Sequence, residues 1–424
     1  MPVSEKLILQ GYEYAKEMYA LRGVDIDAAM KAAKSVAISM HCWQGDDIMG
    51  CESESSLGAT GGIATTGNYP GRARNAAELR ADIDKALELI PGTKKLNLHA
   101  NYAELNGKKL DRDQYTIEQF SAWLDWAREK GMGLDFNPTY FSHPYAADGF
   151  TLASADEKIR AFWIEHGKRC REIAQAFAKA LCQPCVVNFW MPDGYKDVPA
   201  DTAAPRARMV KALDEIFADA SIDTSLVLDA VESKLFGIGV ESYTVGSHEL
   251  MMGYALSRGK LYTLDAGHFH PLEYISGKIS AVLQFSDKLL LHVSRGVRWD
   301  SDHVITLDDE LQNIMNEIVY NGYLGRVCIA LDYFDASINR VAAWVIGMRN
   351  AQKSLLRALL TPRADIVKAE NAMDYTGRLA LIEEAKTLPF SAVWDYYCAQ
   401  ENVPVGEEWL SVVRKYERDV LSAR

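Results

Sequence analysis

Leu226-Val-Leu-Asp-Ala-Val-Glu232 is a short apolar run that ends in an acid, and three similar runs follow it: Leu261-Tyr-Thr-Leu-Asp265, Leu289-Leu-Leu-His292 and Val327-Cys-Ile-Ala-Leu-Asp332. Each run has the composition of a buried strand, and each ends in a group that is costly to bury alone. A single acid at a strand end is commonly a turn former or a helix cap. Four in succession instead predict strands whose polar ends meet around a divalent cation.

Four more segments of this kind precede the runs and bring the number of expected strands to eight. They lie near residues 35–42, 95–100, 133–138 and 185–190. Several of the intervening stretches open with Asn, Thr, Ser or Pro, as helices do, and they include residues 75–90, 116–130, 154–180 and 205–220. Eight strands that alternate with helices predict an α/β protein built as a (β/α)₈ TIM barrel.

The first four strands also end in polar or aromatic residues, namely His41, His99, Asn137 and Trp190. All eight strands therefore present such side chains at one mouth of the barrel. In barrels of this class, the mouth at the carboxyl ends of the strands holds the active site.

Residues 1–335 are expected to form the barrel, with an N-terminal helix and a mobile glycine-rich loop at about 50–72. Residues 336–424 show only helical periodicity, for instance over 338–359 and 379–386. We expect this C-terminal helical extension to contact a neighbouring subunit. The alternative is that it packs only on its own barrel.

Composition excludes several classes of function. A chain of 424 residues with 48% hydrophobic residues buries a large core, and its net charge of −12 repels nucleic acid. It has no apolar run of the roughly 18 residues that a membrane span needs and no signal-peptide pattern. Seven cysteines are few for this length and argue for a reducing compartment, so the cytoplasm is the expected location.

The glycine-rich stretch of residues 58–71 lacks the Gly-Lys-Ser/Thr ending of a phosphate-binding loop. Its glycines allow the backbone changes that a lid over the mouth needs. A flexible surface loop without a catalytic role is the alternative.

Two sets of candidate metal ligands are separated by position. The first contains Glu232, Asp265, His292 and Asp332, at the ends of four neighbouring strands. Its oxygen-rich composition suits Mn²⁺ or Mg²⁺. The second contains His268, Asp300 and Asp302, in the loops just beyond.

The second set predicts a catalytic ion, because three ligands leave positions open for water or substrate. The i, i+2 spacing of Asp300 and Asp302 lets both carboxylates turn toward one point. Five carboxylates in the two sets carry −5, which two divalent ions at +4 nearly neutralise. We therefore expect two ions per subunit.

Other residues at the mouth are candidates for sugar contacts. Lys234 follows Glu232 by two residues and could donate to a substrate oxygen or form a salt bridge to a ligand carboxylate. Trp190 and Phe136 could stack on a sugar face or complete the core, and His99 ends a neighbouring strand. His270, His303 and Asp335 are expected to orient ligands rather than to bind metal.

A mouth with two hard cations, aromatic side chains and polar groups suits a polyol, and its natural reaction is aldose–ketose interconversion. The hydrogen moves between C1 and C2 either as a hydride or through a cis-enediol. We prefer the hydride route, since two cations suit it better than a dedicated base. The alternatives are a metal-dependent sugar epimerase, a metal-dependent endonuclease and a non-catalytic sugar binder.

The chain resembles the bacterial L-rhamnose isomerase family along essentially its whole length. The resemblance is carried by Ser39-Met-His-Cys-Trp-Gln-Gly-Asp-Asp47, Asn68-Tyr-Pro-Gly71, Val231-Glu-Ser-Lys-Leu-Phe-Gly237, Leu264-Asp-Ala-Gly-His-Phe-His-Pro271, Leu291-His-Val-Ser294, Arg298-Trp-Asp-Ser-Asp-His303 and Leu331-Asp-Tyr-Phe-Asp-Ala-Ser337. It implies a barrel with a helical extension, a homotetramer, and conversion of L-rhamnose to L-rhamnulose with Mn²⁺ or Zn²⁺.

The resemblance also implies residue roles. The family's structural metal would bind Glu232, Asp265, His292 and Asp332, and its catalytic metal would bind His268, Asp300 and Asp302. We accordingly assign catalytic roles to Asp332, Lys234, Asp300 and His268. The expected sugar contacts are His99, Trp190, Lys234, Glu232, Asp265 and Phe136.

Overall fold

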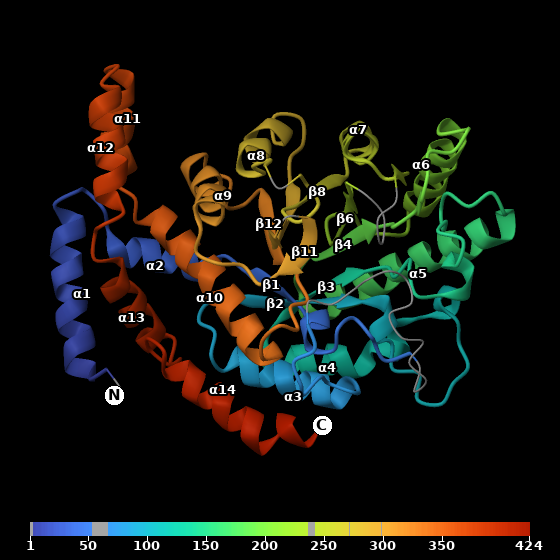
Figure 1. Cartoon of the computed structure of the whole chain (residues 1–424), viewed down its shortest axis with the longest axis horizontal. Helices are drawn as coiled ribbons and strands as arrows, with labels where there is room; N and C mark the ends of the chain where they lie inside the picture. The colour runs from blue at the N-terminus through green and yellow to red at the C-terminus, as the bar shows by residue number, and fades with distance from the viewer. Residues whose placement is uncertain (1–2, 53–66, 236–241, 271, 298) are drawn as a thin grey trace.

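Eight parallel strands close into a barrel at the centre of the computed structural model (Figure 1). The structure describes residues 3–52, 67–235, 242–270, 272–297 and 299–424, with the backbone alone for 299–302. The strands neighbour one another in the order β1-β12-β9-β8-β6-β4-β3-β2. Their bounds are β1 Ile38–His41, β2 Lys94–His99, β3 Gly133–Asn137, β4 Cys185–Trp190, β6 Val227–Glu232, β8 Leu261–Asp265, β9 Leu289–Val293 and β12 Val327–Leu331. All eight expected strands and the barrel class are confirmed.

One helix of the outer ring follows each barrel strand. These helices are α3 Ala76–Leu87, α4 Ser121–Lys130, α5 Glu157–Leu181, α6 Ala203–Phe217, α7 His248–Arg258, α8 Ser276–Val282, α9 Asp309–Tyr320 and α10 Arg340–Leu359. Side-chain caps begin several of them, for example Asn75 on α3 and Asp156 on α5. The last barrel helix is thus α10, which lies beyond the expected boundary at residue 336.

Two short antiparallel ribbons lie in the connections between barrel strands. Strand β5 (Gly194–Tyr195) pairs with β7 (Tyr243–Thr244). Strand β10 (Arg295–Val297), which directly follows β9 in the chain, pairs with β11 (Trp299–His303). Residues 300 and 302 thus lie in a strand rather than in an irregular loop.

Helices from both ends of the chain form a layer beside the barrel. They are α1 Glu5–Ala20, α2 Ile26–Ser35, α11 Arg363–Asn371, α12 Tyr375–Ala385, α13 Phe390–Gln400 and α14 Glu408–Asp419. Helices α1 and α13 lie side by side, with the rings of Tyr12 and Tyr396 stacked at 3.8 Å (Figure 1). A separate apolar core joins them to Leu356 and Leu360 at the end of α10.

The barrel interior is apolar at its base and polar above it. Val186, Ala230, Leu261, Leu290 and Ala330 form a small apolar cluster inside the sheet. Because side chains of a strand alternate between its two faces, the inward positions two residues further along face the mouth. This alternation brings the strand-end residues together above a packed floor.

Candidate metal and sugar site

Glu232, Asp265, His292 and Asp332 form a buried cluster at the carboxyl ends of β6, β8, β9 and β12. One ligand atom from each lies within 4.8 Å of the others. The strand register sets His292 opposite Asp265 on one side and Ala330 on the other. His292 Nδ1 lies 3.4 Å from Glu232 Oε2, 3.7 Å from Asp265 Oδ2 and 3.2 Å from Asp332 Oδ2.

Each carboxylate of the cluster is oriented by a hydrogen bond to one of its oxygens. Asn188 Nδ2 donates to Glu232 Oε2 at 2.5 Å, and Thr263 Oγ1 in turn donates to the Asn188 amide oxygen at 2.8 Å. The backbone N–H of Gly267 donates to Asp265 Oδ1 at 2.6 Å. Such outer contacts fix the direction in which a ligand oxygen points.

Trp43 plays the same part for Asp332. It lies in the short helix η1 (Cys42–Gly45) just after β1, and its Nε1–H donates to Asp332 Oδ1 at 2.9 Å. The other oxygen, Oδ2, faces His292. A tryptophan donor on a carboxylate restricts its rotation without neutralising its charge.

The remaining polar atoms of the cluster point at one another. Among the described residues, Glu232 Oε1, Asp265 Oδ2 and both ring nitrogens of His292 are buried without a hydrogen-bond partner. Buried acceptors without partners are rare in folded proteins, since each costs about 1–3 kcal/mol. The ligand atoms of the whole cluster, one oxygen from each of the three carboxylates and one nitrogen of His292, lie within 4.8 Å of one another and fit a divalent cation of the Mn²⁺ or Mg²⁺ kind.

The pKa values of the cluster residues also indicate a site that favours positive charge. Burial raises the pKa of Asp265 to about 6. Burial also disfavours the charge of Glu232, but His292 and His268 hold its pKa well below the usual range. Although burial opposes its protonation, the neighbouring carboxylates hold the pKa of His292 well above its usual value. A proton on His292 thus supplies charge where a cation would otherwise supply it.

His268 is the member of the second ligand set whose side chain the structure describes. Its Nδ1 lies 3.0 Å from the carbonyl oxygen of Ser233 and 3.0 Å from Glu232 Oε1. Its Nε2 lies 3.2 Å from Lys234 Nζ. The side chains of Asp300 and Asp302 lie outside the described residues, so the second metal site stays a prediction.

Lys234 and Trp190 lie together at the mouth. Lys234 Nζ is 4.9 Å from the centroid of the Trp190 ring, as in a cation–π contact. The Trp190 ring lies 6.3 Å from that of His268. On the adjoining side, the ring of His99 packs edge-on against Trp43 at 5.0 Å.

Phe136 does not lie at the mouth. Its ring packs against Phe120 at 5.0 Å and Phe177 at 5.6 Å, between the barrel and the outer helices. Because Asn137 faces inward, the alternation of β3 turns Phe136 outward. The aromatic residue that takes the expected place is Phe141, whose ring lies 5.5 Å from His99 and 5.7 Å from Trp190.

Residues expected to orient ligands lie further away. Asp335 accepts hydrogen bonds from the backbone of Val304 at 3.2 Å and Ser337 at 2.9 Å, so it shapes the loop after β12. His270 is exposed, and its Nδ1 accepts from the backbone N–H of Leu272 at 3.2 Å. The orienting residues that the sequence analysis missed are Asn188 and Trp43. Asn188 precedes Trp190 by two residues on β4, and this spacing is the signal that could have revealed it.

A buried histidine beside the mouth should make the stability of the protein depend on pH. Burial lowers the pKa of His166 to about 3, and its Nε2 accepts a hydrogen bond from the backbone N–H of Thr139 at 2.9 Å. A folded-state pKa below the unfolded value of about 6.5 means that this stability is fully present above pH 6.5 and decreases as the pH falls.

Between pH 6 and 4 the His166→Gln variant should therefore lose less stability than the wild type, by about 1.4 kcal/mol for each pH unit. Denaturant unfolding at a series of pH values measures this difference. Parallel stability curves for the two proteins would contradict it.

Fold and site together define a class: an α/β-barrel enzyme with buried acidic and histidine ligands at its carboxyl-end mouth. The L-rhamnose isomerase family model matches residues 6–424. The chain is 60% identical over 418 residues to an L-rhamnose isomerase of Rhodopirellula baltica, covering 98% of this chain and 97% of the relative. It is 58% identical to one of Mannheimia succiniciproducens, covering 98% and 99%. The chain belongs to the L-rhamnose isomerase family, and the expected enzyme class, an aldose–ketose isomerase, is confirmed.

A solved structure of L-ribulose 3-epimerase is also similar to this chain, with 14% identity, 80% of this chain and 98% of that chain covered, and a TM-score of 0.48. A likeness this weak carries no argument about function. In the described part of the chain, no helix combines the length and apolar composition needed to cross a membrane.

Proposed function

We propose that this enzyme interconverts L-rhamnose and L-rhamnulose at the barrel mouth, with two divalent ions per subunit. Mn²⁺ is the proposed ion, and Zn²⁺ and Mg²⁺ are alternatives. The observation that carries the proposal is the arrangement of Glu232, Asp265 and Asp332, each with one oxygen oriented by a hydrogen bond and each with a ligand oxygen close to His292. Similarity over the whole chain to proteins named L-rhamnose isomerase supports the substrate.

The candidate ligands would hold two separate ions. Glu232, Asp265, His292 and Asp332 would hold the first ion, and His268, Asp300 and Asp302 the second. Divalent cations bound at these sites supply electrophilic stabilisation of the negative charge that develops on the sugar oxygens. We assign Asp332, Lys234, Asp300 and His268 to the reacting end of the sugar.

The proposed role of Lys234 is to donate a hydrogen bond to a sugar oxygen. Its ammonium lies beside His268 Nε2 and over the Trp190 ring, so it is held between a proposed ligand and an aromatic wall. From there it would donate a hydrogen bond to the oxygen on C1. His99 and Trp190, together with Glu232 and Asp265, would contact the remainder of the sugar.

The reaction that we propose is a hydride shift. The proton leaves the hydroxyl on C2, a hydride moves from C2 to C1, and a proton reaches the oxygen on C1. C2 is thereby oxidised to the ketone while C1 is reduced to the alcohol. The enediol route differs because a base removes the C2 hydrogen as a proton that exchanges with solvent.

Turnover in heavy water should distinguish the two routes. Because a hydride passes directly between the carbons, we expect L-rhamnulose with little deuterium at C1, as measured by NMR or mass spectrometry. Near-stoichiometric deuterium at C1 would establish the enediol route instead.

A metal-titrated assay over a panel of L- and D-aldoses tests the substrate. L-Rhamnose should have the highest kcat/KM, and chromatography should identify a ketose. An epimer as the product would favour the epimerase alternative and contradict the isomerase proposal.

We also propose a homotetramer in the cytoplasm, with subunit contacts made by the helical extension. Helices α11 and α12 project from the molecule (Figure 1), and together with the turn between them they expose Val367, Met373, Tyr375 and Leu379. Exposed apolar side chains on neighbouring helices are typical of protein interfaces. All seven cysteines are free, which supports a reducing compartment.

A further inference from the structure

Arg112 is a buried arginine beside the mouth, with 2% of its surface exposed. It opens the short helix η3 (Arg112–Gln114) in the connection between β2 and α4. All five N–H donors of its guanidinium are used. The acceptors are both carboxylate oxygens of Glu52 at 2.9 and 2.8 Å and the carbonyl oxygens of Thr139 at 2.8 Å, Phe141 at 2.6 Å and Ser142 at 3.3 Å.

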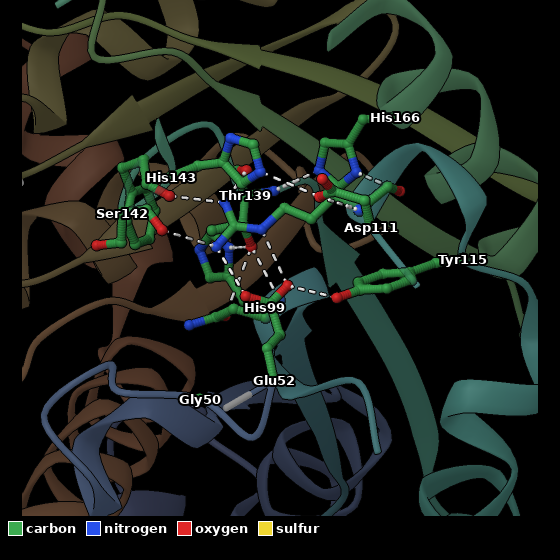
Figure 2. A network of polar contacts seen from close by, with 12 residues as sticks. Gly50, Glu52, His99, Asp111, Tyr115, Thr139, Ser142, His143 and His166 are labelled. Atoms are coloured by element: carbon green, nitrogen blue, oxygen red, sulfur yellow. Dashed lines mark hydrogen bonds and ion pairs between the residues drawn. The ribbon is translucent and has the colours of Figure 1, made fainter. Parts of the chain in front are cut away.

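The guanidinium therefore joins three loops of the barrel mouth. Glu52 follows β1, Arg112 follows β2, and Thr139 and Ser142 follow β3. Figure 2 shows the side chains of Glu52, Tyr115, Ser142 and His99 gathered in this network. Tyr115 Oη donates a further hydrogen bond to Glu52 at 2.9 Å. Only arginine can donate to a carboxylate and three carbonyls at once, because its guanidinium carries five N–H donors. Lysine offers only three donors on one atom.

Two of the residues held by Arg112 contact His99 and Trp190, the two residues that form the proposed sugar wall. The hydroxyl of Thr139 lies 3.0 Å from His99 Nδ1 (Figure 2). The ring of Phe141 lies 5.5 Å from that of His99 and 5.7 Å from that of Trp190. Both contacts are made by residues whose backbone carbonyls Arg112 fixes.

Thr139 is held from both sides of its peptide unit. Its carbonyl accepts from Arg112, and its N–H donates to His166 Nε2 at 2.9 Å. His166 Nδ1 in turn lies 3.1 Å from the backbone carbonyl oxygen of Arg112, so Arg112, Thr139 and His166 each contact the other two. The Thr139 hydroxyl, which also accepts a hydrogen bond from the backbone N–H of Asn101 at 3.1 Å, is thus supported through its own backbone by the guanidinium.

This network is separate from the metal ligands. Since all five Arg112 donors have acceptors in the loops, none is left for Glu232, Asp265, His292 or Asp332. A disturbance of Arg112 should therefore alter the wall that receives the sugar while the ligand cluster keeps its own supports, Asn188 and Trp43.

We propose that Arg112 is a positioning residue for sugar recognition. It orients His99 through Thr139, and it orients Trp190 through Phe141. The inference rests on the proposed function, because it concerns how that site receives an aldose. Its kinetic signature is a higher KM at a nearly unchanged kcat. Metal affinity should not change.

The test compares Arg112→Lys and Thr139→Val with the wild type on L-rhamnose at saturating Mn²⁺. We expect KM to rise about 10-fold to 100-fold in Arg112→Lys, by analogy with the partners that orient metal ligands, and to rise also in Thr139→Val. The kcat value and the Mn²⁺ affinity should stay close to those of the wild type. Thr139→Val keeps every charge and the volume of the side chain, so it remains informative if Arg112→Lys fails to fold.

Arg171→Lys is the matched control. Arg171 is 1% exposed and forms a bidentate pair with Asp229, at 2.8 and 3.0 Å, away from the residues of the sugar wall. Its substitution should lower the melting temperature but leave KM unchanged. An equal rise of KM in Arg171→Lys would show that loss of any buried arginine pair suffices, and it would overturn the proposal.

Other outcomes are equally decisive. An unchanged KM in both mouth variants, or a fall of kcat with KM constant, would overturn the positioning role. In the double variant, the rise of KM should be smaller than the product of the two single rises, because both act on His99. A rise of KM equal to the two single rises multiplied together would contradict the proposal that Arg112 acts on His99 through Thr139. Absence of L-rhamnose turnover in the wild type would instead refute the proposed function.

Discussion

The Glu232→Gln variant should lose both metal and turnover, with kcat reduced on the order of 10³-fold. The substitution keeps the shape of the side chain but replaces a charged ligand oxygen with an amide group. It also removes one of three carboxylates that attract the cation, and a metal ion contributes several kcal/mol of transition-state stabilisation. Steady-state kinetics and the metal content per subunit, measured by mass spectrometry, test both losses.

Two further variants should have a smaller effect and no effect on metal affinity and activity. Asn188→Ala removes only the hydrogen bond that orients Glu232, so we expect a decrease of about 10-fold to 100-fold in metal affinity or activity. Glu249→Gln makes the same substitution at an exposed position on α7 and should change neither quantity. A Glu232→Gln enzyme with full metal content and wild-type kcat would exclude Glu232 as a ligand.

Chelation of the divalent ions should abolish turnover and lower the melting temperature, and Mn²⁺ should restore both. Without a cation, Glu232, Asp265 and Asp332 face one another with ligand atoms within 4.8 Å. Repulsion between two such charges is on the order of 3 kcal/mol at an effective dielectric constant of 20. A bound ion removes this repulsion and stabilises the folded state by about 2.7 kcal/mol when its concentration is 100 times Kd.

Treatment with the chelator already saturated with Mn²⁺ is the control for effects other than metal removal. It should leave activity and melting temperature unchanged. Full turnover after the metal content has become negligible would contradict a metal-dependent isomerase and favour a reaction that needs only protein groups.

The barrel and its ligand cluster could be predicted because both depend on short-range patterns. Apolar runs such as residues 261–265 predict buried strands, and a polar residue at the end of each run predicts the mouth. Since parallel strands of a barrel end at the same rim, side chains distant in the chain, such as those of Glu232 and Asp332, were expected to meet. The structure places them as expected.

The misplacement of Phe136 has a different cause. An aromatic residue near a strand end suggested a sugar contact, but the inward position of Asn137 already implies that Phe136 faces outward. Phe141 lies in the loop beyond the strand, where alternation no longer applies. Its place at the mouth depends on the carbonyl that Arg112 holds.

The order of the strands, their polar ends and the identity of the candidate ligand residues follow from the chain alone, because local periodicity and composition encode them. The direction in which each ligand oxygen points does not. The contact of Trp43 with Asp332 joins positions 289 apart in the sequence, and the Arg112 fork joins three separate loops. Only the closed barrel brings these partners within hydrogen-bonding distance, because no local pattern specifies a contact between distant loops.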